Sequence, residues 1–212
     1  MRKSKRYDVS ELVEAQFEPG SKRSVLKNLL GISNKFEMED LEAQALEAAI
    51  ELFLKRVKRN HRFTGKEICE MHGTWLGNIY PWAGRYRQVQ MSKGNFAFAS
   101  ARHIPTLMQE FEKNQLFHHT PCIFKETSRV VRALAEVHVE LILIHPFREG
   151  NGRLARLLST LMGKQAGLGG MDFEPIIGKH RNRYFSAVRS GMGKDYVPME
   201  KLFEEVIRRT TS

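Results

Sequence analysis

The chain of 212 residues has the length of a single domain with short tails, and its 42% hydrophobic and 27% charged residues exclude a disordered or fibrous protein. No apolar run approaches the roughly 18 residues of a membrane span, and no apolar stretch follows the basic N-terminus as it would in a signal peptide. The two cysteines, Cys69 and Cys122, fit neither a metal-binding spacing nor a disulfide framework. We therefore expect a protein of a reducing, cytoplasmic compartment with no membrane partner.

The formal net charge of +10 lies mostly at the two ends of the chain. Residues 1–36 hold eight basic and four acidic side chains, and residues 179–212 hold the same numbers, whereas residues 37–178 are nearly balanced. Three interpretations are open from composition alone: nucleic-acid binding, binding of a polyanionic substrate such as a nucleotide, and solvated basic ends. The last is favoured, and nucleic acid is not the expected partner.

The first third of the chain predicts two helices after an irregular start. Residues 1–36 contain a Pro-Gly break and only a short apolar patch, so we expect them to be loosely ordered. Apolar residues at helical spacing predict a long helix over residues 39–59. Thr64 and Glu67 have the spacing of a capping box, which predicts the start of a second helix that ends at Pro81.

Residues 84–99 change to an extended type of sequence. Two candidate strands, residues 86–91 and 95–98, are separated by residues 92–94. Gly94 supplies the left-handed conformation that a tight turn needs. We expect a short β-hairpin here and no other β-structure.

Helical periodicity returns in the second half of the chain. It predicts a helix near residues 106–114, a central helix over 128–144, another over 152–163, and a last helical region over 183–209 that is interrupted near 191–193. The expected fold class is therefore all-α with one β-hairpin.

The stretch from His145 to Arg156 joins the central helix to the next one and carries the strongest chemical signal. Gly150, Asn151 and Gly152 tolerate unusual backbone angles and stand at the N-terminus of the second helix. Free backbone N–H groups and the helix dipole make such a position an anion site that suits phosphate.

The charged residues of this stretch complement a phosphate ligand. Arg153 and Arg156 lie three residues apart on the first helical turn, where their guanidinium groups can bind phosphate oxygens. Glu149 would repel phosphate unless a bridging Mg²⁺ lies between them. His145 is suited to act as a general base near neutral pH. Each residue alone is usually structural, but their combination in one loop favours a site.

The residues 145–156 read His-Pro-Phe-Arg-Glu-Gly-Asn-Gly-Arg-Leu-Ala-Arg and resemble the signature of the Fic family, His-x-Phe-x-Asp/Glu-Gly-Asn-Gly-Arg-x-x-Arg, at every position. Residues 81–87 resemble the segment that leads into the Fic flap, and the hairpin at 84–99 resembles the flap itself. The resemblance implies a Fic fold, a helical bundle with one short β-hairpin flap. It covers residues 25–206 and leaves 1–24 as a basic N-terminal extension and 207–212 as a C-terminal tail.

The resemblance implies protein adenylylation, in which AMP moves from ATP to a Ser, Thr or Tyr hydroxyl of a target protein. In this family pattern His145 deprotonates the hydroxyl, and Glu149 holds Mg²⁺ against the phosphates. The same pattern implies that the phosphates are bound by the backbone of Gly150 and Gly152 and by the side chains of Asn151, Arg153 and Arg156.

The resemblance also implies roles outside the loop. The flap, residues 84–99, would hold the target protein by β-augmentation. Ser92, Lys93 and Gly94 at its turn would touch the nucleotide. Tyr184 falls where the family places an adenine contact, and a core position is the alternative for this residue.

Alternative functions are distinguished by single features. Fic relatives that transfer phosphate instead of AMP have lysine where this chain has Gly152, so AMP transfer is favoured. A nucleic-acid-binding module would bind DNA in a salt-sensitive way that survives His145→Ala. A catalytically inactive interaction domain is disfavoured because the loop is intact.

Many Fic proteins are restrained by a helix with the pattern Ser/Thr-x-x-x-Glu-Gly/Asn, whose glutamate would pair here with Arg156. The chain contains no complete match. Ser10 to Glu14, followed by Ala15, is the only serious candidate for an internal brake. The favoured hypothesis is a toxin-like protein that is restrained by a separate small antitoxin, and a translocated effector remains an open alternative.

Overall fold

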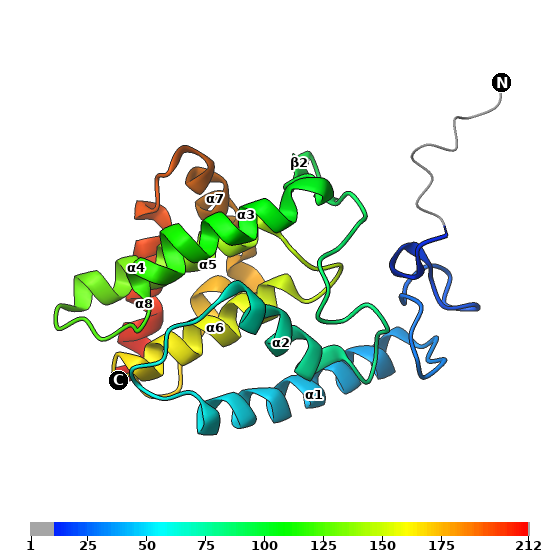
Figure 1. Cartoon of the computed structure of the whole chain (residues 1–212), viewed down its shortest axis with the longest axis horizontal. Helices are drawn as coiled ribbons and strands as arrows, with labels where there is room; N and C mark the ends of the chain where they lie inside the picture. Colours follow the sequence, from blue (N-terminus) through cyan, green and yellow to red (C-terminus); the bar gives the residue numbers. More distant parts are fainter. Residues whose placement is uncertain (1–10, 212) are drawn as a thin grey trace.

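The computed structural model describes residues 11–211, and its backbone confirms the predicted all-α class with one hairpin (Figure 1). The helices are α1 (Lys35–Arg56), α2 (Gly65–Leu76), α3 (Ile104–Phe111), α4 (Phe117–His119), α5 (Thr127–Ile144), α6 (Asn151–Gln165), α7 (Arg181–Ser190) and α8 (Val197–Thr211). A π-helical turn, Glu112–Leu116, joins α3 to α4. The two strands are β1 (Ser92–Lys93) and β2 (Phe96–Ala97). None of the helices within residues 11–211 combines the length and apolarity needed to cross a membrane.

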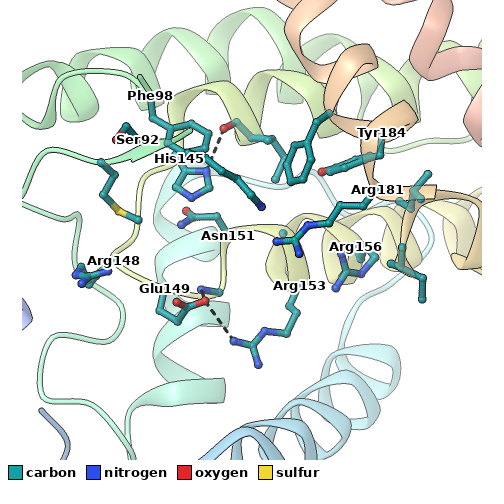
Figure 2. A pocket seen from close by; sticks show the side chains of 18 of the residues that line it. Ser92, Phe98, His145, Arg148, Glu149, Asn151, Arg153, Arg156, Arg181 and Tyr184 are labelled. Atoms are coloured by element: carbon teal, nitrogen blue, oxygen red, sulfur yellow. Dashed lines mark hydrogen bonds and ion pairs between the residues drawn. The ribbon is translucent and has the colours of Figure 1, made fainter. Parts of the chain in front are cut away.

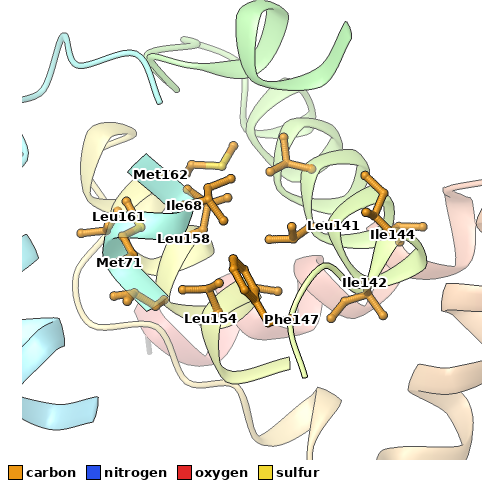
Figure 3. Packing of buried hydrophobic residues seen from close by; sticks show 14 of the residues in the cluster. Ile68, Met71, Leu141, Ile142, Ile144, Phe147, Leu154, Leu158, Leu161 and Met162 are labelled. Atoms are coloured by element: carbon orange, nitrogen blue, oxygen red, sulfur yellow. The ribbon is translucent and has the colours of Figure 1, made fainter. Parts of the chain in front are cut away.

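The core lies around α5, which packs against α6 and α8. Figure 3 shows Leu141 of α5 facing Leu154 and Leu158 of α6, with Phe147 of the connecting loop in the same cluster. Phe147 is completely buried, as expected for a residue that fixes its loop to the core. Replacing such a buried leucine by alanine costs about 2–5 kcal/mol. The two helices are therefore rigid supports for the loop between them.

Most helix boundaries agree with the predicted ones within four residues, but α2 ends at Leu76, five residues before the predicted stop at Pro81. α1 runs from Lys35 to Arg56 instead of over 39–59, because Asn34 caps it: the Asn34 side chain accepts hydrogen bonds from the backbone of Phe36 and Glu37 at 2.9 and 3.2 Å. The predicted capping box of α2 is present. α3 starts at Ile104 because a proline occupies its first turn.

The hairpin is present, but the predicted strand register was wrong. Ser92 pairs with Ala97 and Lys93 with Phe96, so residues 92–93 form a strand instead of the turn. Gly94 has the expected positive φ of +56°. Residues 86–91 do not pair with β2 in a regular ladder, because buried side chains take up backbone groups of Gln88 and Val89.

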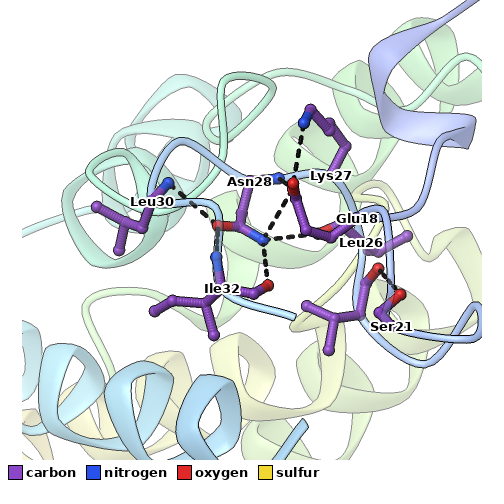
Figure 4. A network of polar contacts seen from close by, with 8 residues as sticks. Glu18, Ser21, Leu26, Lys27, Asn28, Leu30 and Ile32 are labelled. Atoms are coloured by element: carbon purple, nitrogen blue, oxygen red, sulfur yellow. Dashed lines mark hydrogen bonds and ion pairs between the residues drawn. The ribbon is translucent and has the colours of Figure 1, made fainter. Parts of the chain in front are cut away.

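The N-terminal segment is more ordered than predicted, within the part that the structure describes. Figure 4 shows that Glu18 and Asn28 form a polar network: the Glu18 carboxylate pairs with Lys27 at 3.0 Å and accepts a hydrogen bond from the Asn28 backbone at 3.2 Å. The Asn28 amide also bonds the carbonyl of Ile32 at 2.8 Å. Buried polar contacts leave no periodic apolar pattern in the sequence, so residues 11–34 appeared loosely ordered.

The predicted domain boundaries remain predictions. An isolated bridge between Phe17 and Leu26 crosses the boundary at residue 24, and α8 continues through residue 206 to Thr211. The region between these boundaries has one hydrophobic core, in which α6 packs against both α5 and α1.

Candidate functional site

A pocket of about 520 Å³ lies between the α5–α6 loop, the flap and the start of α7 (Figure 2). Every residue predicted for the site lines it except Gly94. Gly94 borders a neighbouring pocket of about 280 Å³ between the flap and α7. Residues 92–93, 145–156 and 184, which are distant in sequence, thus meet in one place.

The loop that forms the floor of the pocket is shaped by two residues in the left-handed region. α5 ends at His145, with φ of +53°, and α6 begins after Gly150, with φ of +81°. A Cβ atom on Gly150 would lie 2.6 Å from a ring carbon of Trp75, so only glycine fits. Asn151 fixes the loop from inside, since its side chain accepts from Phe147 N at 2.9 Å and donates to Phe147 O at 2.8 Å.

The N-terminus of α6 opens into this pocket. Among residues 11–211, no side chain forms a capping hydrogen bond there. The backbone N–H groups of the first turn and the positive end of the helix dipole are therefore available to an anion. This confirms the expected placement of the loop at a helix N-terminus, while the contacts of Asn151 with a phosphate stay a prediction.

His145 lies at the wall of the pocket with a defined tautomer. Its Nδ1 is 3.2 Å from the carbonyl oxygen of Ile142. A carbonyl can only accept, so Nδ1 carries the proton and Nε2 keeps its lone pair. Phe98 of the flap stacks on the imidazole, with ring centroids 3.7 Å apart. Burial lowers the pKa of His145 to about 4, and the positive charges of Arg87 and Lys93 act in the same direction. The ring is therefore a neutral base at pH 7.

The two arginines of α6 differ in their partners. Arg153 Nη2 lies 2.7 Å from a carboxylate oxygen of Glu42 and 3.4 Å from one of Glu149. Within residues 11–211, no carboxylate forms an ion pair with Arg156, and burial lowers the pKa of its guanidinium group. Of these two arginines, Arg153 thus has carboxylate partners, whereas Arg156 has none among residues 11–211.

The family follows from a comparison of the sequence. Residues 62–162 match the sequence model of the Fic/DOC family. The chain is thus similar to the Fic/DOC family over just under half of its length. It is 29% identical over 196 residues to the protein adenylyltransferase Fic of Aedes aegypti and, equally, to that of Culex quinquefasciatus. Each match covers 89% of this chain but only 36% of the relative, so the chain spans about a third of these curated relatives.

Solved structures show the same fold. The N-terminal Fic domain of the Bep8 effector from a Bartonella species superposes with a TM-score of 0.72 at 22% identity, covering 86% of this chain and 90% of that one. BepC of Bartonella tribocorum, solved with bound AMPPNP, superposes with a TM-score of 0.71 at 22% identity, covering 92% and 97% of the two chains. The Fic fold that the loop motif implied is confirmed.

The sequence left two alternatives for Tyr184, an adenine contact and a core position, and its place in the structure has features of both. It is buried and lines the Fic pocket, but its hydroxyl lies 2.9 Å from Nε2 of His138. Burial lowers the pKa of His138 to about 3, so that imidazole is neutral. The Ser159 hydroxyl donates its proton to Ala155 O, so its oxygen can only accept from Nδ1 of His138, 3.3 Å away. Nδ1 therefore carries the proton of the neutral ring, and Nε2 accepts from the Tyr184 hydroxyl. Only the Tyr184 ring is available to a ligand.

Sequence reasoning missed several residues of the Fic pocket. Arg148 and Arg181 both line it, and Phe98 covers His145. Arg148 occupies a variable position within the family pattern, so its residue type was the only signal. Arg181 is the first residue of α7, and nothing in the sequence places α7 over the loop.

His72 was also missed, although it connects α2 to the loop. Its Nδ1 accepts a hydrogen bond from the Gly84 backbone at 2.8 Å, so the proton is on Nε2, which donates to the carbonyl of Glu149 at 3.1 Å. The ring stacks on Phe147 with centroids 4.0 Å apart. His72 therefore joins the start of the flap to the phosphate loop.

Proposed function

We propose that this chain transfers AMP from ATP to a Ser, Thr or Tyr hydroxyl of a target protein. The observation that carries the proposal is the neutral His145, whose Nε2 is free, in the same pocket as an uncapped helix N-terminus and the unpaired Arg156. The insect relatives are named protein adenylyltransferases, and the related BepC structure contains AMPPNP, an analogue of ATP. Both facts support ATP as the nucleotide.

The reaction follows from these placements. The triphosphate lies against the α6 N-terminus, with Arg153 and Arg156 neutralising its outer phosphates. The target hydroxyl loses its proton to Nε2 of His145, and its oxygen bonds to the α-phosphorus. The bond between that phosphorus and the bridging oxygen breaks, and pyrophosphate leaves. Because His145 is already neutral, no proton has to be removed from it first.

Glu149 fits the expected Mg²⁺. It is the only carboxylate that lines the pocket within residues 11–211, and one of its oxygens accepts a hydrogen bond from Gly150 N at 2.8 Å. No group of three or more potential metal ligands exists among these residues. Mg²⁺ commonly binds one or two carboxylates together with nucleotide phosphates, and Glu149 supplies one such carboxylate. Bound there, Mg²⁺ would neutralise charge on the phosphates, and transfer that persists in EDTA would contradict this assignment.

Gly152 supports AMP transfer over phosphate transfer. A Cβ atom at this position would meet only the Arg156 guanidinium, at 3.6 Å, so the space above the first helical turn is open. A long basic side chain at residue 152 would fill that space. The open position is suited to a nucleotide whose α-phosphate lies at the helix N-terminus.

We propose that the target protein binds at the flap. β1 and β2 form a two-stranded ladder beside His145, and an extended target segment can add to such an edge. Lys93 lies over the ring of Phe185, with Nζ 3.8 Å from the centroid, where the two neighbouring pockets meet. This position supports the proposal that Ser92, Lys93 and Gly94 contact both the nucleotide and the target.

We also propose that a separate small protein restrains this activity by supplying a glutamate to Arg156. Two facts support restraint in trans. Arg156 has no carboxylate partner within residues 11–211, and the Glu14 carboxylate is bound to the backbone of Gln88 and Val89 instead. Ser10, the other half of the candidate brake, lies outside the described residues. Strong activity of the purified chain alone supports this proposal, and near silence would contradict it.

The transferase proposal is tested with ATP labelled at either the α- or the γ-phosphate, incubated with the purified chain and a cell lysate. We expect protein labelling from the α-phosphate only. His145→Ala should abolish labelling while AMPPNP binding, measured by calorimetry, persists. His118→Ala, which changes an exposed histidine of α4, is the matched control and should remain active. Labelling from the γ-phosphate would show that phosphate is transferred instead.

A further inference from the structure

The buried Arg87 guanidinium connects the α5–α6 loop, which carries His145, to both arms of the flap. Its Nε donates to the carbonyl of His145 at 2.7 Å. Its Nη1 donates to Val89 O and its Nη2 to Ala99 O, each at 2.6 Å. The side chain is 1% exposed, so no water competes for these donors.

The carbonyl groups of Val89, Ala99 and His145 lie at structurally important points of the flap and the loop. Val89 precedes β1 and Ala99 follows β2, so they mark the two ends of the hairpin. His145 has a left-handed backbone, which a residue with a Cβ adopts only at an energetic cost. The Arg87 guanidinium therefore stabilises the left-handed backbone of His145 and fixes the distance between His145 and the flap.

From the N-terminal segment, Glu14 forms a brace that holds the same region. Its carboxylate, in a side chain that is 6% exposed, accepts hydrogen bonds from Gln88 N at 2.6 Å and Val89 N at 3.1 Å. Its backbone carbonyl accepts from Nε of Arg148, a residue of the catalytic loop, at 2.8 Å. Burial lowers the pKa of Arg87, and the negative charge of Glu14 opposes that shift.

We propose that Glu14 and Arg87 are positioning residues that set the distance between His145 and the flap, so that the N-terminal segment promotes target modification. The inference rests on the proposed transferase function. It predicts the opposite sign to an internal brake, because removal of Glu14 lowers transfer instead of releasing it. Neither residue lines the pocket itself, so we expect ATP binding to be largely independent of both.

The first test compares Glu14→Ala, Glu14→Gln and Arg87→Lys with the wild type. Glu14→Ala should lower kcat for target modification at least about tenfold, since small displacements of reacting groups have effects of this size. The Kd for AMPPNP should change less than about threefold, because the phosphate contacts stay in place. Glu14→Gln keeps an acceptor oxygen and should recover part of the loss. Arg87→Lys keeps the charge but cannot reach three carbonyls, and should resemble Glu14→Ala.

Glu18→Ala is the matched control, because Glu18 is a second buried glutamate of the same segment whose carboxylate bonds Lys27 and Asn28 (Figure 4). It should lower the melting temperature and leave kcat within about twofold of the wild type, since its contacts do not reach the flap. If Glu14→Ala equals or exceeds the wild type in transfer, the proposal is overturned. Equal losses in Glu14→Ala and Glu18→Ala would overturn it as well, by showing a general loss of stability.

Hydrogen exchange of residues 88–99 separates this proposal from the transferase proposal. Glu14→Ala should speed exchange in this stretch at neutral pH, whereas Glu18→Ala should not. If the wild type shows no transfer, the proposed function fails, but faster flap exchange in Glu14→Ala alone still supports the brace. Unchanged flap exchange in Glu14→Ala overturns the brace whatever the activity.

Discussion

The Nη2 atom of Arg153 lies 2.7 Å from a carboxylate oxygen of Glu42, a buried residue in the second turn of α1. Tyr80 donates its hydroxyl to the other oxygen of Glu42 at 2.6 Å, and Trp75 Nε1 donates to the Glu42 backbone at 2.8 Å. The Arg153 guanidinium also lies over the Trp75 ring, 4.7 Å from its centroid. α1 and α2 thus fix Arg153 at the proposed phosphate site, and the Glu42 carboxylate partly neutralises its charge.

Glu42→Gln tests the electrostatic consequence of this pair. Glutamine keeps one acceptor oxygen for Arg153 and can donate its NH2 group to the Tyr80 hydroxyl oxygen, but it removes a negative charge near the proposed triphosphate site. We expect the Kd for ATP to fall by roughly three- to tenfold, the size of one partly screened charge interaction. Glu47→Gln, an exposed position on the same helix, should leave the Kd unchanged. Weaker binding in Glu42→Gln would show that orientation of Arg153 outweighs the charge.

Gly150→Ala and Gly152→Ala form a pair with contrasting outcomes. At Gly150 the backbone is left-handed and a methyl group would meet the Trp75 ring at 2.6 Å, whereas at Gly152 it would meet only Arg156, at 3.6 Å. We expect Gly150→Ala to destabilise the protein by about 2–4 kcal/mol, combining backbone strain with overpacking. Gly152→Ala should be within about 0.5 kcal/mol of the wild type. Denaturant unfolding of both variants measures the difference, and equal values would contradict the proposed packing of Trp75.

The sequence predicted the phosphate loop well because its determinants are contiguous. The apolar faces of α5 and α6 and the Gly-Asn-Gly segment are visible in the sequence, whereas the bonds that Arg87 and His72 make to the loop are not. The hairpin register was mispredicted because Glu14 and Arg87 take backbone groups that a regular strand would pair. The Glu42–Arg153 pair joins side chains from two different helices, and no local pattern marks either partner.

The pH dependence of transfer should show no step near the ordinary pKa of histidine. Burial lowers the pKa of His145 to about 4, so the base is neutral at pH 6 and at pH 8. We expect kcat/KM for ATP to differ less than about twofold between these values, whereas a base with a pKa of about 6.5 would lose roughly fourfold at pH 6. A descending limb centred near pH 6.5 would place His145 in a more polar environment than the structure shows.

Stability should fall as the pH is lowered below about 6.5, the ordinary pKa of histidine. Burial lowers the pKa of His72 and His145 to about 4 and that of His138 to about 3, so all three remain neutral in the folded protein when the unfolded chain takes up protons. Because the unfolded state then binds more protons, the free energy of unfolding decreases with falling pH between about 6.5 and 4. Near pH 5.5 the three imidazoles together give a slope of roughly 4 kcal/mol per pH unit. His138→Gln removes one of them, and the slope from urea unfolding at pH 5, 5.5 and 6 should drop by about a third. An unchanged slope in this variant would mean that His138 is protonated in the folded state, against its contacts with Tyr184 and Ser159.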